Sequence, residues 1–248
     1  AGLLMRSTQQ CISELDNLLM FKGRILAIAS HDSKTPLGSI KIASNVIKNE
    51  IKKDNPNIED VLSHIEIIET SNRNHSEFLN NMLSIAKFDS GEIQIQKEKV
   101  LPEELFKNLT INHQFYFTSK EIKFSMNSNF SDEEKLNIDK DKMMSVLNNL
   151  VQNAIKFTEH GGVIELNFEK IGDKHLIHVK DSGIGIPDEK RQLIFNAFSQ
   201  SSKGTKSESG SGLGLWIVKL FTNLHGGDVS FESEKGKGTV FTISLPLV

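Results

Sequence analysis

The hydrophobic residues of this chain follow a helical repeat over its first third, and beyond residue 91 they follow a mixed pattern of helical and strand spacing. In the first stretch, apolar side chains recur at helical spacing at Leu18, Phe21, Ile25 and Ile28 and again at Leu37, Ile40, Ile47 and Ile51. Pro56 interrupts the pattern. A second stripe then advances in steps of four and three through Val61, Ile65, Ile68, Asn72, His75, Leu79, Met82 and Ala86. The spacing predicts two long helices joined by a short turn.

A helical hairpin of this kind leaves part of its apolar stripe without cover. A second copy of the chain is the simplest cover, and it would give a dimeric four-helix bundle. The alternative is that the stripe packs against the rest of the same chain. Asn72 and His75 are polar members of the stripe, so we expect the seam to be wetter at its middle.

The pattern becomes mixed after Gly91, which stands at a position that favours the end of a helix. Helices are predicted at Pro102–Ser119, Asp139–Phe157, Asp188–Phe198 and Gly214–Leu224, and strands at Ile122–Met126, Val163–Glu169, Leu176–Lys180, Val229–Ser233 and Thr239–Leu245. We therefore expect an α+β protein of two domains. A helical hairpin would occupy residues 1–90, a linker 91–100 and an α/β domain 101–248.

Composition excludes several other classes of protein. The 248 residues include 29 basic and 32 acidic side chains, with a net charge of −3 and 38% hydrophobic residues. This balance argues against a collagen, a disulfide mini-protein and a broadly basic nucleic-acid binder. Cys11 is the single cysteine and cannot close an internal disulfide, and the longest apolar run, Ile25–Ala29, falls far short of the roughly 20 residues that cross a bilayer.

The chain begins at Ala1 with no basic segment followed by an apolar run. We therefore expect a cytoplasmic portion of a larger protein, with no nucleic-acid partner and no membrane contact from this segment. Whether the full-length protein is anchored in a membrane stays open.

The most reactive group of the helical half lies in the segment Ser30–Leu37, which reads SHDSKTPL. His31 stands beside the carboxylate of Asp32, and Thr35 follows four residues later on the same helix face. Pro36 lacks an amide hydrogen and favours a bend just past the histidine. The pattern indicates a nucleophile with an orienting acid. The alternative is that His31 is one of eight histidines, on a solvated helix face.

A polar stripe marks the helix predicted at Asp139–Phe157. Asn149, Asn153 and Lys156 share one face at positions i, i+4 and i+7. An amide oxygen is a hard ligand for Mg²⁺, and an ammonium is a point charge for phosphate. The stripe therefore suggests phosphate chemistry, with an ordinary wet helix face as the alternative.

Two glycine-rich turns point to the same chemistry. Asp181–Pro187 follows a predicted strand, and Gly210–Leu215 opens a predicted helix. Closely spaced glycines let backbone N–H groups approach phosphates, and a helix N-terminus adds partial positive charge. The dinucleotide fingerprint GxGxxG and the GxxxxGK[ST] loop are both absent from the sequence.

The segment Ser199–Gly212 contains no apolar residue. Such a stretch cannot offset its ordering entropy through burial, so we expect a mobile flap over a site. Lys203 and Lys206 would meet anionic phosphates from this flap. An inert surface loop is the alternative.

Taken together, these segments resemble the catalytic core of bacterial two-component sensor histidine kinases. The similar motifs are the family's H box at Ser30–Leu37, N box at Asn149–Thr158, glycine boxes at Asp181–Pro187 and Gly210–Leu215, and F box at Ile194–Phe198. The resemblance covers nearly the whole chain. It implies an antiparallel helical hairpin that forms a dimeric four-helix bundle, followed by an α/β sandwich of the GHKL (Bergerat) ATP-binding type.

The resemblance also implies a reaction. Nε2 of His31 would attack the γ-phosphoryl group of ATP while Asp32 orients the ring. The phosphoryl group would then pass to an aspartate on a response-regulator receiver domain, and Thr35 would place a water for dephosphorylating that receiver. An imidazole with an ordinary pKa of about 6.5 is a competent neutral nucleophile near neutral pH. The implied protein is a homodimeric protein-histidine kinase, with phosphatase activity left open.

The expected cofactors are ATP and Mg²⁺. By the same resemblance Asn153 would ligate Mg²⁺, Lys156 and Asn149 would contact phosphates, and Asp181 would accept a hydrogen bond from the adenine amino group. The other candidates for nucleotide binding are Gly183, Gly185, Lys203, Lys206, Gly210, Gly212, Leu213 and Gly214.

The H box departs from the family pattern at two positions. Ser33 stands where a larger apolar residue is common, and Lys34 stands where Arg is common. Lysine is a poorer planar donor than arginine, so an ion pair bracing this box would be weaker here.

Two rival functions would use the same nucleotide-binding fold. A nucleotide-binding pseudokinase would signal as a dimer without chemistry. A GHKL-type ATPase would need a hydrolytic carboxylate on the N-box helix, where this chain has asparagines. The sequence leaves open the input signal, the identity of the receiver, phosphorylation within or across subunits, and the balance of kinase and phosphatase.

Overall fold

The computed structural model describes residues 33–89, 92–131, 134–197 and 212–247. The chain divides into two compact units, residues 1–93 and 94–248. The predicted site residues His31, Asp32, Lys203, Lys206 and Gly210 lie outside the described residues. Across the part of the chain that is described, no helix combines the length and the apolar character needed to cross a membrane.

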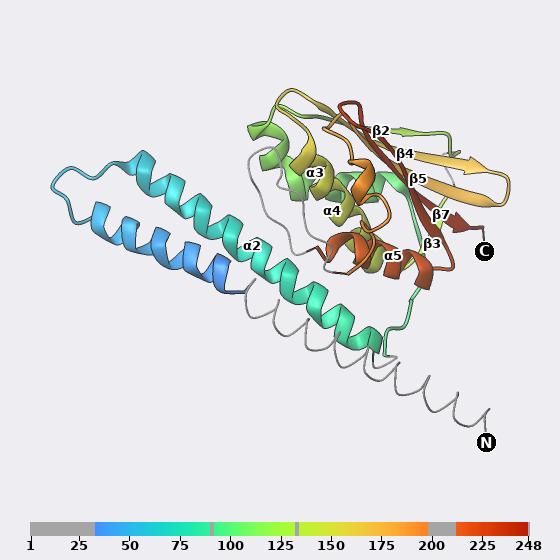
Figure 1. The fold of residues 1–248 in the computed structure, drawn as a ribbon, viewed down its shortest axis with the longest axis horizontal. Coiled ribbons are helices and arrows are strands. Elements are labelled where there is room, and N and C mark those ends of the chain that lie inside the picture. Colours follow the sequence, from blue (N-terminus) through green and yellow to red (C-terminus); the bar gives the residue numbers. More distant parts are fainter. Residues whose placement is uncertain (1–32, 90–91, 132–133, 198–211, 248) are drawn as a thin grey trace, which may run out of the picture. The chain divides into compact units, whose positions relative to one another are not determined.

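The first unit contains the predicted helical hairpin (Figure 1). Residues 33–50 are helical, a turn follows over 51–57, and helix α2 runs over Ile58–Asp89. The buried carboxylate of Glu50 accepts the backbone N–H of Asn57 at 3.0 Å and a hydrogen bond from the Lys53 ammonium. The hydrogen bond from Lys53 holds the pKa of Glu50 below its usual value. This carboxylate therefore stabilises the turn between the two helices.

The buried face of α2 is only partly the stripe predicted from the sequence. The buried and half-buried side chains at steps of three and four are Val61, His64, Ile68, Ser71, His75, Phe78, Met82 and Ile85. Four residues of the predicted stripe are exposed in the single chain: Ile65, Asn72, Leu79 and Ala86. An α-helix carries adjacent stripes with the same spacing, so the spacing alone could not separate them.

A second apolar stripe on α2, here named the outer stripe, is exposed in the single chain. Its members are Ile58, Leu62, Ile65, Leu79 and Leu83. They continue the spacing of four and three, interrupted by the polar residues Glu69, Asn72 and Ser76. The hairpin therefore buries one apolar stripe and leaves another uncovered.

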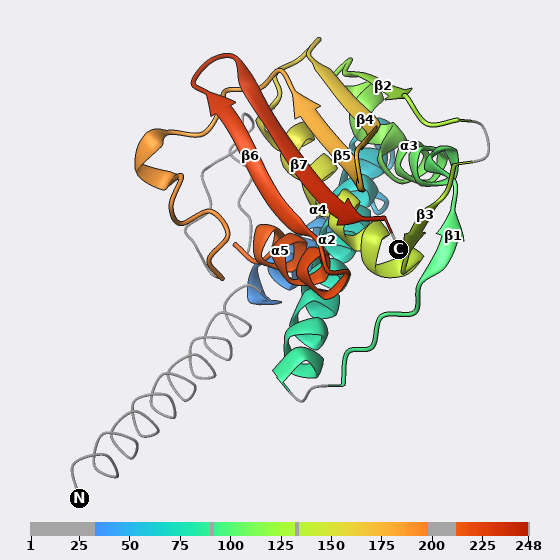
Figure 2. The same cartoon turned by 90° about the vertical axis from the view of Figure 1, so that its right-hand side faces the viewer.

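The second unit is an α/β sandwich (Figure 2). Its five-stranded sheet has the order β2-β4-β5-β7-β6. The strands are β2 (Lys123–Ser128), β4 (Val163–Ile171), β5 (Lys174–Asp181), β6 (Asp228–Glu234) and β7 (Gly238–Pro246). Strands β2 and β4 are parallel, and the other neighbours are antiparallel. Helices α3 (Pro102–Ser119), α4 (Lys140–Phe157) and α5 (Gly214–Leu224) cover one face of this sheet.

Alternation along the strands places the core between the sheet and the helices. In β4 the side chains of Ile164, Leu166 and Phe168 are fully buried, whereas Glu165 and Asn167 between them are not. The apolar faces of α4 and α5 supply the other half of the core, with Met143, Val146, Leu147, Leu150, Val151, Ile217, Val218 and Phe221. The fold class expected from the sequence, a helical hairpin followed by an α/β sandwich, is confirmed.

Two short strands were missed by the prediction. β1 (Glu98–Val100) and β3 (Leu136–Ile138) pair antiparallel. β1 lies in the segment predicted as linker, so the chain has already joined the second unit there. Strands of three residues are too short to show an alternating pattern.

The helix predicted at Asp188–Phe198 is wrong for the residues that the structure describes there. Only a 3₁₀-helix, η1 (Asp188–Lys190), forms, and turns follow over residues 191–197. Backbone hydrogen bonds of the i to i+3 type run through this segment, for example from Leu193 N–H to the Lys190 carbonyl. The ring of Phe195 packs against Phe231 and Phe241 at centroid distances of 6.0 and 6.3 Å, and contacts with such distant segments are not visible in the local apolar spacing.

Replacing Phe168 by alanine should destabilise the second unit by about 3–5 kcal/mol, because the ring is fully buried and its loss leaves a cavity. Ile171→Ala on the same strand removes a side chain that is 56% exposed, and it should cost less than about 1 kcal/mol. Urea unfolding followed by circular dichroism measures both. Equal losses would contradict this account of the core.

Candidate functional site

Asp181 ends β5 as a nearly buried carboxylate. Its Oδ1 accepts the N–H of Gly183 at 2.8 Å and the N–H of Thr239 at 3.2 Å. Within the described part of the chain, its Oδ2 has no hydrogen-bond partner. Burial raises the pKa of Asp181 to about 6, against the smaller opposite effect of the two N–H donors. The carboxylate is held by one oxygen, and the other is left without a donor in the described residues.

The first glycine turn touches the end of α4. The N–H of Ile184 donates to the carbonyl oxygen of Phe157 at 3.1 Å, and a Cβ on Gly183 would lie 2.5 Å from that same oxygen. Gly185 has φ +73°, and a Cβ there would collide with the carbonyl oxygen of Glu234. Both glycines are therefore required by close backbone contacts within the protein.

Ser233 and Thr239 support this turn and were not predicted. The Ser233 hydroxyl accepts the N–H of Ile186 at 2.8 Å and lies 2.9 Å from the Thr239 hydroxyl. Thr239 also pairs with Asp181 across the register of β5 and β7. In the sequence these residues are ordinary polar positions of two strands, and only the strand order brings them to Asp181.

Helix α4 presents the predicted polar stripe. Asp139 caps its N-terminus by accepting the N–H of Lys142 at 3.0 Å. Asn153 and Lys156 are half-buried on this helix. The Asn153 amide has no hydrogen-bond partner in the described segments, and the Lys156 ammonium lies 5.1 Å from the ring centroid of Phe157. An unengaged amide oxygen and a nearby cation suit a Mg²⁺–phosphate group.

The second glycine turn meets α4 at Asn149. The Asn149 side chain is buried, and its amide nitrogen donates to the Ser145 carbonyl at 2.8 Å. A Cβ on Gly214, the first residue of α5, would collide with Oδ1 of Asn149. This geometry favours a packing role for Asn149 over the phosphate contact expected from the sequence. The buried side chain of Leu213 and the φ of +70° at Gly212 shape the approach to α5.

The structure thus brings three predicted motifs to one helix. α4 contacts the first glycine turn at Phe157 and the second at Asn149. Thr35 belongs to the first unit, where it is exposed on the helical residues 33–50. In the described ranges no cluster of three His, Cys, Asp or Glu side chains could hold a metal ion, so a cation here would depend on the Asn153 amide and on phosphate oxygens.

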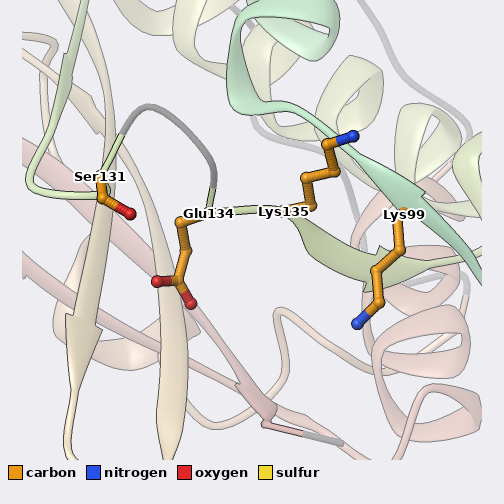
Figure 3. Close-up of a pocket in the computed structure, with 4 residues that line it drawn as sticks. All are labelled: Lys99, Ser131, Glu134 and Lys135. Atoms are coloured by element: carbon orange, nitrogen blue, oxygen red, sulfur yellow. The ribbon is translucent and has the colours of Figure 1, made fainter.

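A separate hollow in the second unit contains none of the predicted site residues (Figure 3). It is lined by Lys99, Ser131, Glu134 and Lys135. The Glu134 carboxylate accepts hydrogen bonds from Lys170 at 2.8 Å and His175 at 3.1 Å, which hold its pKa below the usual value. His175 lies near the start of β5, whereas Asp181 ends that strand, so this cluster is not part of the glycine-lined site.

Replacing Asp181 by asparagine should stabilise the second unit above pH 7. A folded-state pKa of about 6, against an unfolded value of about 3.9, means that the stability contributed by the protonated carboxyl is complete below pH 4 and is lost as the pH rises through 6. The gain should approach about 3 kcal/mol at pH 8, since one pKa unit corresponds to about 1.4 kcal/mol. Urea unfolding at pH 8 and pH 4.5 measures it, and a gain that grows toward acid pH would contradict the assignment.

Comparison with known proteins adds the family. Residues 21–91 match the model of the His Kinase A (phospho-acceptor) domain. Residues 138–248 match the model of the histidine kinase-, DNA gyrase B- and HSP90-like ATPase. Together the two matches contain the segment Ser30–Leu37, the polar stripe of α4 and both glycine turns.

Curated relatives align over almost the entire chain. Hybrid signal transduction histidine kinase D of Dictyostelium discoideum is 33% identical over 98% of this chain and 16% of its own length. Sensor protein EvgS of Escherichia coli O157:H7 is 32% identical over 93% of this chain and 19% of its own length. Sensor protein SrrB of Staphylococcus aureus is 28% identical over 93% of this chain and 39% of its own length. The chain therefore spans well under half the length of these relatives.

Solved structures show the same architecture. The catalytic domain of histidine kinase ThkA is 28% identical, with a TM-score of 0.54 over 61% of this chain and 95% of that chain. The structure of ThkA in complex with response regulator protein TrrA matches with a TM-score of 0.64 over 94% of this chain and 64% of that chain, at 22% identity, which shows the fold alone. This chain therefore contains, in the same order, the two domains of a sensor histidine kinase catalytic core: a phospho-acceptor helical domain and a GHKL-type ATPase domain.

Proposed function

We propose that this chain phosphorylates its own His31 with ATP and passes the phosphoryl group to an aspartate on a response-regulator receiver domain. The observation that carries the proposal is the meeting of two glycine turns on α4, beside a buried carboxylate with one free oxygen. In the first step a bond forms between Nε2 of His31 and the γ-phosphorus as the bond from that phosphorus to the leaving oxygen of ADP breaks. Phosphoryl transfer asks the protein mainly for positioning and charge neutralisation.

The described residues fit a nucleotide. Oδ2 of Asp181 would accept a hydrogen bond from the adenine amino group, and its pKa of about 6 keeps it ionised at pH 7.5. Asn153 would hold Mg²⁺ through its amide oxygen, and Lys156 would face a phosphate. Bound Mg²⁺ supplies neutralisation of phosphate charge. We assign Asn149 to the placement of Gly214, and we keep Lys203, Lys206 and Gly210 as candidates for phosphate binding.

The roles in the helical unit extend the same proposal. Asp32 would orient the His31 ring, and the exposed hydroxyl of Thr35 would place a water that dephosphorylates the receiver. The receiver as partner is supported by the solved complex of ThkA with its response regulator. We further propose that residues 1–90 form the phospho-acceptor domain, that the ATP-binding domain begins with β1, and that the reaction takes place in the cytoplasm, where ATP is available.

The outer stripe supports a homodimer. Ile58, Leu62, Ile65, Leu79 and Leu83 expose between 39% and 60% of their surface in the single chain. Packing this stripe against a second copy would remove it from water and complete a four-helix bundle. We therefore propose that the chain acts as a homodimer joined along α2.

Incubation of the chain with Mg²⁺ and γ-labelled ATP should label the protein, and the label should be acid-labile and base-stable. His31→Gln should abolish it, because the substitution removes the nucleophilic nitrogen. His64→Gln is the matched control on the same hairpin and should keep the label. Labelling that survives His31→Gln would mean that another residue is the nucleophile, and no labelling of the native chain would favour the pseudokinase alternative.

Leu62→Glu should lower the molar mass in solution from that of a dimer to that of a monomer, because it places a charge in the proposed apolar contact. Ile67→Glu changes a residue that is also exposed but lies outside the outer stripe, so it should leave the dimer intact. Light scattering coupled to size-exclusion chromatography reads the molar mass. Dimers of unchanged stability in the Leu62 variant would refute the outer stripe as the interface.

A further inference from the structure

Helices α4 and α5 lie antiparallel and are joined at both ends of the span they share. At one end Gly214 starts α5 against the buried side chain of Asn149. At the other end His225, the C-cap of α5, bonds to Asp139, the N-cap of α4. At a rise of 1.5 Å per residue, the stretches 139–149 and 214–225 are both about 15–17 Å long. Two helices of matched length are therefore pinned at both ends.

The contact at the far end is made by His225, and both nitrogens of its ring have hydrogen-bond partners. His225 is buried, its Nε2 accepts the backbone N–H of Asp139 at 3.0 Å, and its Nδ1 donates to the Phe221 carbonyl at 2.7 Å. This pair of bonds requires the neutral ring with its proton on Nδ1. Burial also lowers the pKa of His225, which favours that neutral form. Only the Nε2 bond joins the two helices, because Phe221 belongs to α5 itself.

The segment that enters the second unit also bonds to Asp139 and His225. The N–H of Gln96 donates to Oδ2 of Asp139 at 3.1 Å, and the Lys97 ammonium donates to the His225 carbonyl oxygen at 3.1 Å. Oδ1 of Asp139 meanwhile caps α4 through the N–H of Lys142. Every polar atom of Asp139 and His225 thus has a defined partner. A displacement of α5 along α4 would break the bond between Asp139 and His225 and disturb the two bonds made by Gln96 and Lys97.

We propose that His225 is a positioning residue for nucleotide binding, acting through the bond from its Nε2 to Asp139. The buried side chains of Ile217, Val218 and Phe221 already hold α5 in the core, and Gly214 seats its first turn against Asn149. Apolar packing is non-directional, so the hydrogen bond about 15 Å from Gly214 adds the directional restraint on how α5 lies along α4. It therefore holds the backbone of Gly212–Gly214 in a fixed direction relative to Asn153 on α4. This inference rests on the proposed function, in which those two elements hold the phosphates and Mg²⁺.

A purely structural role for His225 predicts a different outcome. If His225 only fills space in the core, any smaller side chain would leave a cavity. The free energy of unfolding would then fall, and the affinity for nucleotide would stay unchanged. A positioning role depends instead on which hydrogen bond is kept. The chain offers two substitutions that separate these cases, because glutamine and asparagine place an amide at the position of Nε2 and of Nδ1 respectively.

The test compares His225→Gln with His225→Asn. Glutamine can still accept the N–H of Asp139, whereas asparagine can only reach the Phe221 carbonyl. Calorimetric titration with Mg²⁺ and a non-hydrolysable ATP analogue, at pH 7.5 and well below the unfolding midpoint, should give an affinity within about threefold of the native chain for glutamine. Asparagine should weaken the affinity about tenfold or more. Equal affinities in both variants would overturn the inference.

A second measurement needs no nucleotide. Amide hydrogen exchange at residues 214–217 should be faster in His225→Asn than in the native chain and unchanged in His225→Gln. If His225→Asn does not fold, His225→Met replaces it, since methionine has similar length and no comparable acceptor for the Asp139 N–H. Unchanged exchange in His225→Asn, or in His225→Met where it replaces the asparagine variant, would refute the positioning role. Failure of the native chain to bind the analogue would instead refute the proposed function.

Discussion

Close contact between α4 and the two glycine turns is the constraint on which the proposed nucleotide site depends. At Gly183 and Gly214 a single Cβ would meet an oxygen atom of Phe157 or Asn149. These contacts place the end of β5 and the start of α5 on the same helix, although about 30 residues separate them in the sequence. The packing of the protein therefore requires these glycines, whether or not a ligand is bound.

The burial of Asp181 lowers the stability of the folded chain. Its carboxylate is held in a nearly dry position by two backbone N–H groups, and its burial raises its pKa. A charged group of this kind destabilises the folded chain at neutral pH, and within the described residues one of its oxygens has no hydrogen-bond donor. Thr239, which donates its N–H to the other oxygen, is itself held by its contact with Ser233 and by its pairing with Asp181 across β5 and β7.

Much of this organisation could be predicted from the sequence. The bounds of α3 and α5 agree with the prediction, because their apolar spacing and their flanking residues act locally. The region 188–197 could not be predicted, since the contacts of Phe195 with Phe231 and Phe241 join segments far apart in the chain and have no signature in the local apolar spacing. Thr239 and His225 were missed because a lone polar residue in a strand or at a helix end has no local signature of the partner it will meet.

By itself, the sequence determined the candidate motifs of this protein: the histidine beside an acid, the asparagine stripe, the two glycine turns and their order along the chain. Each of these depends on residue type and on spacing within one element. Only the tertiary structure decided which apolar stripe of α2 is buried, which oxygen of Asp181 is free, and that Asn149 packs against Gly214. These outcomes depend on contacts between segments far apart in the chain, and such contacts are set by the competition of all segments for the same buried space.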